Sequence, residues 1–155
     1  MGLYFLFFKK DDAFPQCNKK LIIKYVIIIF LMQLTMYATS RHNIASISMN
    51  WESALPILIL VVLVPFYEEV IYRGCLFGFL HSIFKGDIFF PYVISSAVFC
   101  LLHTDSRTIG TYFFLFCVAI IFTHVRVKSN SIIYSFILHS SMNASFVLLN
   151  MQRFF

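Results

Sequence analysis

One stretch decides the fold class of this protein, and it covers residues 54–84: ALPILILVVLVPFYEEVIYRGCLFGFLHSIF. Its formally charged residues are Glu68, Glu69 and Arg73, which lie near its middle. About 20 apolar residues are enough for a helix to cross the hydrocarbon core of a bilayer. The stretch is therefore predicted to be a membrane-embedded helix that is longer than one simple crossing requires.

The composition of the whole chain supports this interpretation. Of its 155 residues, 60% are hydrophobic and 12% are charged, and the mean hydropathy is +0.83. Globular proteins average roughly 45–50% apolar and about 25% charged residues. A soluble domain of this length could not cover so much apolar surface, so we predict an integral protein of the cell membrane. The net charge of +5 then indicates cationic anchors at the membrane surface and no nucleic-acid partner.

The apolar residues fall into five blocks, which cover residues 21–38, 54–84, 88–103, 111–124 and 131–149. Short polar connections separate the later blocks, at residues 85–87, 104–110 and 125–130. Backbone groups in lipid must be satisfied internally, and a β-barrel would need alternating polarity, so we predict an all-α, multi-pass transmembrane bundle of about five helices. Three parts are expected: an N-terminal interfacial segment (polar at residues 9–20) with a variable transmembrane helix (1–53), a functional core (54–149) and a C-terminal tail (150–155).

The charges inside the second block are candidate functional groups. Placing a charge in a bilayer interior costs roughly 2.5–3.5 kcal/mol per residue on insertion scales. Glu69 and Arg73 are four residues apart, so on a helix they can form an ion pair on one face. Glu68 points about 100° away and is left without a local partner. A buried carboxylate of this kind is a candidate general base or acid.

Two later blocks carry further side chains at the same spacing. Phe99 and His103 are four residues apart in the third block, and His139 and Asn143 are four residues apart in the fifth. Residues at this spacing share one face of a helix. Each pair is therefore predicted to line one face of its helix.

Distances along the chain predict which of these side chains meet. Glu68 precedes Gly86 by almost the same length of chain as separates Gly86 from His103. In an antiparallel hairpin that turns at Gly86, the two side chains are expected at nearly equal depth. The histidine and asparagine of the fifth block lie closer to the connection at position 130 than Glu68 lies to Gly86. Unless the helices tilt, His139 is therefore expected more than two turns shallower than Glu68, and Asn143 roughly one turn shallower.

The polar residues of three membrane blocks, taken in order, resemble the three signature motifs of the CPBP family: Glu68-Glu69-x-x-x-Arg73, Phe99-x-x-x-His103 and His139-x-x-x-Asn143. This family comprises the CAAX prenyl endopeptidases and the bacteriocin-processing or immunity proteins, and it is also called the Abi family. The resemblance covers roughly residues 54–149, which it identifies as a CPBP intramembrane protease core. The first apolar block resembles the variable helices of the family.

The resemblance implies an intramembrane endopeptidase that hydrolyses a peptide bond in a membrane-associated substrate, either prenylated and CAAX-like or of the bacteriocin type. Glu68 would activate the attacking water with the help of His103. His139 and Asn143 would donate hydrogen bonds to the oxyanion of the tetrahedral intermediate, an interaction worth roughly 2.7–4 kcal/mol per donor elsewhere. The expected partners are the lipid bilayer and a membrane-associated peptide or lipidated protein.

Metal dependence is left open by the same residues. Glu68, His103 and His139 could supply the two nitrogens and one oxygen of a catalytic zinc site. However, the sequence contains no His-Glu-x-x-His motif, and the three ligands would come from three separate helices. We therefore expect a glutamic endopeptidase without a cofactor, with a zinc metalloendopeptidase as the alternative.

Other functions fit parts of the pattern. A protein of this fold could act in bacteriocin self-immunity, or as a membrane scaffold, without proteolysis. A small transporter or proton relay would also place glutamate and histidine inside the membrane, but the chain lacks the internal repeat common in transporters. Glu69 and Arg73 would order an active site, or they could form an ion pair with a purely structural role.

Overall fold

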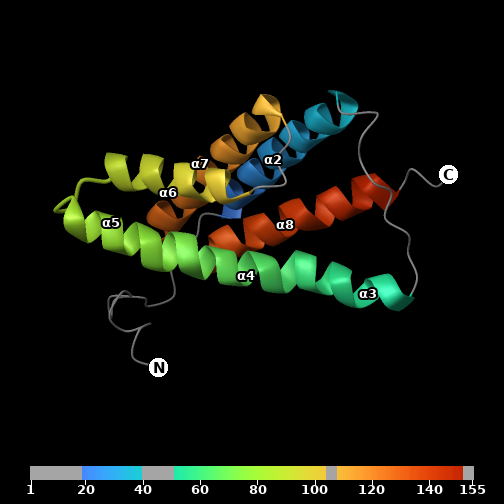
Figure 1. Ribbon diagram of the computed structural model, residues 1–155, viewed down its shortest axis with the longest axis horizontal. Coiled ribbons are helices and arrows are strands. Elements are labelled where there is room, and N and C mark those ends of the chain that lie inside the picture. Colours follow the sequence, from blue (N-terminus) through green and yellow to red (C-terminus); the bar gives the residue numbers. More distant parts are fainter. Residues whose placement is uncertain (1–18, 40–50, 104–107, 152–155) are drawn as a thin grey trace.

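The computed structural model describes residues 19–39, 51–103 and 108–151 (Figure 1). Within these ranges the chain forms helices and no strand, which confirms the predicted all-α bundle. The predicted interfacial lead-in lies almost entirely outside the described residues. The same is true of the tail beyond residue 151 and of most of the connection at 104–110.

The second apolar block forms one continuous helical run. Its parts are α3 (Trp51–Leu58), a π-helical segment (Ile59–Leu63), α4 (Val64–Glu69), a second π-helical segment (Val70–Leu76) and α5 (Phe77–Ile83). Pro56 and Pro65 both lie in this run. Because proline has no N–H and its ring crowds the preceding turn, a helix accommodates it by a local change of hydrogen-bond register. π-helical turns provide such a change, and they frequently accompany functional sites.

Four further helices complete the described bundle: α2 (Lys19–Thr39), α6 (Phe89–Leu102), α7 (Ile109–Ser129) and α8 (Ile132–Met151). Together with the long run, three of them are long and apolar enough to cross a membrane. α6 has 14 residues, or about 21 Å of helix, which is less than a bilayer core of about 30 Å. The protein is therefore a multi-pass membrane protein, and α6 is too short to cross a bilayer core of that thickness by itself.

The turn between α5 and α6 lies where the sequence places it. Lys85 and Gly86 have positive φ angles of 51° and 92°. Glycine adopts such a conformation at little cost because it has no Cβ atom. The side chain of Asp87 then accepts a hydrogen bond from the backbone N–H of Phe89, at 2.7 Å, and so caps the start of α6.

The connection predicted at residues 125–130 is wrong, because α7 continues to Ser129. Val125 is fully buried in the core. Its burial stabilises the helical conformation at a point where charged residues are its neighbours in the sequence. Asn130 ends the helix in the left-handed conformation, with φ of 51°. Asparagine tolerates this conformation better than most residues do. Two residues therefore separate α7 from α8.

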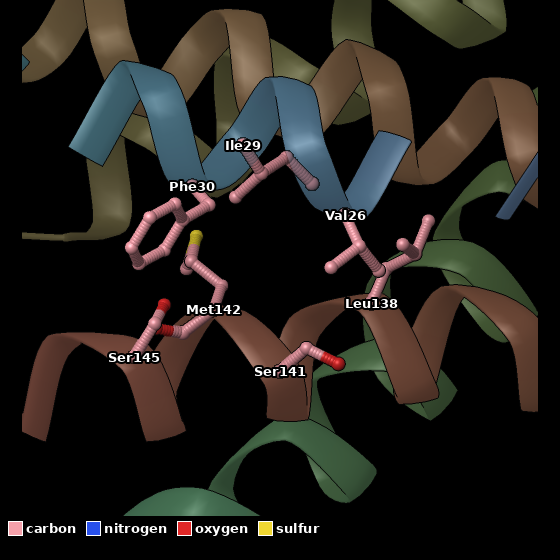
Figure 2. Close-up of a pocket in the computed structure, with 7 residues that line it drawn as sticks. All are labelled: Val26, Ile29, Phe30, Leu138, Ser141, Met142 and Ser145. Carbon is pink, nitrogen blue, oxygen red and sulfur yellow. The ribbon is translucent and has the colours of Figure 1, made fainter. Parts of the chain in front are cut away.

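The core of the bundle lies between α2, α7 and α8. Ile29, Val118, Phe122 and Leu138 are among the apolar side chains buried there. Many apolar side chains on the outer faces are exposed, as expected of a surface that faces lipid. A cavity of about 80 Å³, lined mainly by apolar side chains, separates parts of α2 and α8 (Figure 2).

A buried polar contact also ties α2 to α8. The side-chain amide of Gln33 donates a hydrogen bond to the carbonyl of Met142, at 2.9 Å, and its oxygen accepts one from the hydroxyl of Ser145. Gln33 is 7% exposed. A polar side chain in an apolar environment needs such partners, so α2 is held against the part of α8 that carries His139 and Asn143.

Candidate active site

A buried ion pair lies at the centre of the site. Arg73 Nη1 is 3.1 Å from Glu69 Oε1, and the two side chains are 1% and 0% exposed. The predicted contact between Glu69 and Arg73 is thereby confirmed. The second terminal nitrogen of Arg73 donates a hydrogen bond to the carbonyl of Ala119 on α7, at 3.3 Å. The pair therefore fixes the second helical run against α7 as well as balancing two charges.

Aromatic rings enclose the guanidinium group of Arg73. Its central carbon lies 4.4 Å from the ring centroid of Phe99 and 5.2 Å from that of Phe122. Phe122 also stacks on the imidazole of His139, with centroids 4.9 Å apart. These contacts exclude water from the ion pair and hold the histidine ring in one orientation.

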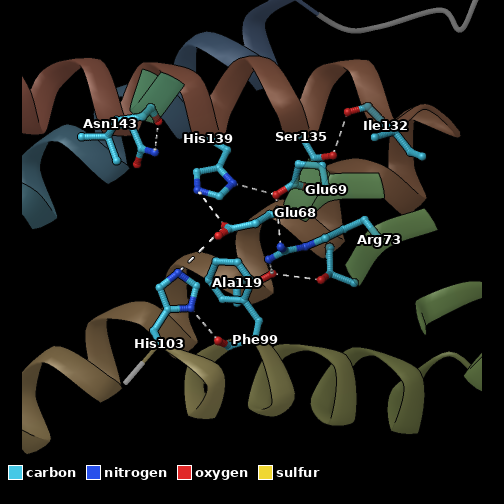
Figure 3. Close-up of polar contacts among 12 residues, drawn as sticks. Glu68, Glu69, Arg73, Phe99, His103, Ala119, Ile132, Ser135, His139 and Asn143 are labelled. Atoms are coloured by element: carbon cyan, nitrogen blue, oxygen red, sulfur yellow. Dashed lines mark hydrogen bonds and ion pairs between the residues drawn. The ribbon is translucent and has the colours of Figure 1, made fainter. Parts of the chain in front are cut away.

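Glu68 points away from the ion pair and towards two histidines, as Figure 3 shows. Its Oε2 atom lies 3.7 Å from His139 Nε2 and 3.9 Å from His103 Nε2. The contact with His103 agrees with the prediction that Glu68 and His103 lie at nearly equal depth. Both distances exceed that of a hydrogen bond, and Oε2 has no hydrogen-bond partner in the part of the chain that the structure describes. Oε2 is thus buried and lacks a donor, whereas the carboxylate as a whole has a side-chain hydrogen bond with Tyr67.

The hydrogen bonds of the two histidines determine which nitrogen faces Glu68. Nδ1 of His103 is 2.7 Å from the carbonyl oxygen of Phe99, and Nδ1 of His139 is 2.9 Å from Glu69 Oε1. Both partners are acceptors, so each Nδ1 carries a proton and donates it. Each Nε2 is then either an acceptor, in a neutral ring, or a second donor, in a charged ring. His103 is 30% exposed and His139 only 2%, so His103 lies at the open side of the site.

The depth predicted for His139 is wrong. The side chain meets Glu68 and Glu69 although it lies only half as far along the chain from Asn130 as Glu68 lies from Gly86. The turn at Gly86 must therefore extend further than the turn at Asn130, by about 13 Å of helix. In Figure 1 the α5–α6 turn does reach past the neighbouring ends of α7 and α8.

The depth predicted for Asn143 is also wrong, and its side chain has a different partner. Asn143 Nδ2 donates a hydrogen bond to the carbonyl oxygen of Leu60, at 2.8 Å. Leu60 precedes Glu68 by about two helical turns. Asn143 therefore shares a face of α8 with His139 but lies beside the π-helical segment at Ile59–Leu63, further along the same interface between helices.

Sequence reasoning missed the contribution of α7. Ala119 and Phe122 hold Arg73 and His139 in place, yet α7 carries no motif that would mark them. Both look like ordinary apolar residues of a membrane helix. Their full burial, at 0% exposure, is the only signal of their role, and it becomes visible once the helices are packed.

The side chains named as alternative zinc ligands lie near one another in the structure. Glu68 faces His103 and His139 across 3.9 Å and 3.7 Å, respectively. Even so, no three His, Cys, Asp or Glu side chains in the described ranges are grouped so that they could hold a metal ion. What the geometry offers is a carboxylate oxygen with two imidazole nitrogens less than 4 Å from it.

The chain is similar in sequence to known proteins. The chain is 27% identical to the membrane-embedded CAAX protease MroQ of Staphylococcus aureus, over 79% of this chain and 53% of that protein. It is 40% identical to the UPF0177 protein YxdF of Lactococcus lactis, over 57% of this chain and 49% of that protein. The chain thus spans about half the length of these relatives. No solved structure matches it.

A family match covers most of the described site. Residues 50–145 match the family described as type II CAAX prenyl endopeptidase Rce1-like. This range contains all three motifs, from Glu68 to Asn143, and it includes both π-helical segments. The match confirms the resemblance that the three motifs predicted. The chain therefore belongs to the type II CAAX prenyl endopeptidase Rce1-like family.

Proposed function

We propose that this chain is an intramembrane endopeptidase that hydrolyses a peptide bond in a membrane-associated peptide or lipidated protein, with Glu68 as the general base. One observation carries the proposal. Glu68 Oε2 is buried, lacks a donor among the described residues and lies 3.9 Å and 3.7 Å from two imidazole nitrogens. A carboxylate held in this way is available to take a proton from a water molecule.

In the proposed reaction, one O–H of the water donates to Glu68 Oε2 and the other to Nε2 of a neutral His103. The water oxygen then attacks the carbonyl carbon of the substrate, and its proton passes to Glu68. When the tetrahedral intermediate collapses, the C–N bond breaks and Glu68 returns the proton to the leaving amine. The products are a carboxylic acid and an amine, and the enzyme regains its initial state.

His139 and Asn143 are the proposed donors to the oxyanion. His139 can donate from Nε2 only when its ring is charged, and Glu69, which accepts the hydrogen bond from Nδ1, stabilises that form. Asn143 has a second amide hydrogen besides the one bonded to Leu60.

We propose that this mechanism needs no metal. Its support is that Glu68 Oε2 and the Nε2 atoms of His103 and His139 each have a role as proton acceptor or donor in the proposed reaction without a cation. The test is cleavage by purified protein after exhaustive dialysis against a chelator. Retained activity is expected. Loss of activity with EDTA and its recovery with Zn²⁺ would favour the metalloendopeptidase instead.

The central experiment compares the wild-type protein with Glu68→Gln in native membranes, with cleavage of a farnesylated CAAX peptide and of a bacteriocin-precursor peptide as readouts. The amide is nearly isosteric with the carboxylate but cannot accept a proton. We expect cleavage of at least one substrate by the wild type and a loss of about 10²–10⁴-fold in the variant, the range typical of a general base.

The competing function, self-immunity or scaffolding without proteolysis, makes a different prediction for the same variants. If Glu68→Gln and His103→Ala accumulate normally and leave a protective phenotype intact, proteolysis is not what the protein does in the cell. If both abolish protection at normal expression levels, the protease proposal is supported.

A further inference from the structure

The carbonyl group of Leu60 has lost its usual partner within the helix. In an α-helix it would accept a hydrogen bond from the N–H of Val64, four residues later. That N–H instead bonds to Ile59, in the π-helical register. The next donor in this register, five residues after Leu60, is residue 65, and Pro65 has no N–H. The orphaned carbonyl lies in a membrane span, where an unsatisfied backbone group is costly.

Asn143 supplies the missing donor. Its Nδ2 atom lies 2.8 Å from the Leu60 oxygen, across the interface between α8 and the second helical run (Figure 3). The contact fixes the rotamer of Asn143 one turn along α8 from His139. A side-chain amide has two N–H groups, so the second stays available for a ligand once the first is bound.

We propose that Pro65 is a positioning residue for Asn143: by denying Leu60 a backbone donor, it leaves a carbonyl that orients the asparagine amide for oxyanion binding. The catalytic part of this inference rests on the proposed function. Pro65 is fully buried and begins the turn of α4 that leads to Glu68. A single proline would thereby connect the helix that carries the base to the helix that carries the oxyanion donors.

The test is a double-mutant cycle on the full-length protein in detergent micelles, with the midpoint of denaturant unfolding as the first readout. Pro65→Ala restores a backbone N–H near Leu60. Asn143→Ala should lower the midpoint in the wild-type background and lower it much less in the Pro65→Ala background. Pro56→Ala, in the same helical run but more than two turns away, is the matched control and should leave the effect of Asn143→Ala unchanged.

The second readout is the turnover of a farnesylated CAAX peptide, resolved into kcat and KM. Pro65→Ala should lower kcat with little change in KM, and it should have no further effect in an Asn143→Ala background. A proline that only shaped the helix would lower kcat equally in both backgrounds.

Several results would overturn the proposal. One is an equal loss of stability from Asn143→Ala with and without Pro65. Another is an effect of Asn143→Ala on the unfolding midpoint that depends on Pro65, together with an unchanged kcat in Pro65→Ala. Failure of both Pro65→Ala and Pro65→Leu to fold would also count against it, because a restored backbone donor should stabilise the helix. A wild-type protein that cleaves no substrate would contradict the proposed function, while the unfolding cycle would still decide whether Pro65 positions Asn143.

Discussion

Glu68 and Glu69 are neighbours in the sequence, yet the structure predicts opposite consequences for their replacement by glutamine. Glu69 is fully buried and contacts both Arg73 and His139. Glu68 lies next to two imidazoles but within hydrogen-bond distance of neither. We therefore expect Glu69→Gln to impair stability, and Glu68→Gln to impair chemistry alone.

The expected loss of unfolding free energy follows from the groups that each substitution leaves without a partner. Removing one partner of a buried ion pair costs about 3–5 kcal/mol, because the other charge stays buried and unpaired. Glutamine keeps a neutral acceptor for Arg73, which recovers about 1 kcal/mol. The expected loss for Glu69→Gln is therefore about 2–4 kcal/mol. For Glu68→Gln it is below about 1 kcal/mol, because Glu68 Oε2 accepts no hydrogen bond from the described residues and the amide is nearly isosteric with the carboxylate.

The assay is equilibrium unfolding in mixed micelles of detergent and SDS, followed by far-UV circular dichroism, on both variants and the wild type. A combined Glu69→Met and Arg73→Met variant serves as a rescue, since replacing both partners of a buried pair with apolar side chains is often neutral. Equal destabilisation by the two glutamine variants would refute the reasoning. So would a loss below about 1 kcal/mol for Glu69→Gln.

Three further substitutions test other contacts in the structure. Gln33→Leu removes the polar tie between α2 and α8 and should cost about 1–2 kcal/mol in the same unfolding assay, whereas Leu31→Ala, at a lipid-facing position, should cost less. Phe122→Ala should lower the free energy of unfolding by about 3–5 kcal/mol and also reduce cleavage, because the ring packs on Arg73 and His139. Its control, Phe113→Ala on the outer face of α7, should leave cleavage unchanged. His103→Phe should reduce kcat by about 10²–10⁴-fold at nearly unchanged stability, since the side chain is 30% exposed; a large fall in the unfolding midpoint would instead indicate a structural role.

Interactions within one helix were predictable because they depend on local geometry. The spacing of Glu69 and Arg73 places both on one face of any helix, whatever surrounds it. The depth of His103 relative to Glu68 was predictable for a similar reason, because a single tight turn at Gly86 joins their helices. Counting residues from that turn gives the register directly, and the contact at 3.9 Å agrees with it.

The same counting failed for α8. His139 reaches Glu68 because the turns at Gly86 and Asn130 end at different depths, and no local pattern records that difference. The extension of α7 to Ser129 was missed for a related reason. The tertiary burial of Val125 outweighs the charged residues beside it.

The sequence by itself determined the membrane environment, the all-α fold class, the ion pair and the identity of the polar side chains that lie within the membrane. Composition and spacing are sufficient for these, since they report what a helix in lipid can and cannot bury. Only the tertiary structure decided which of those side chains meet. It placed two imidazoles near Glu68 Oε2, an oxygen that has no hydrogen-bond donor among the described residues, and it placed Asn143 against Leu60. The physical reason is that the axial register between helices is set by packing across their whole interface, and packing is not encoded in the spacing of any one of them.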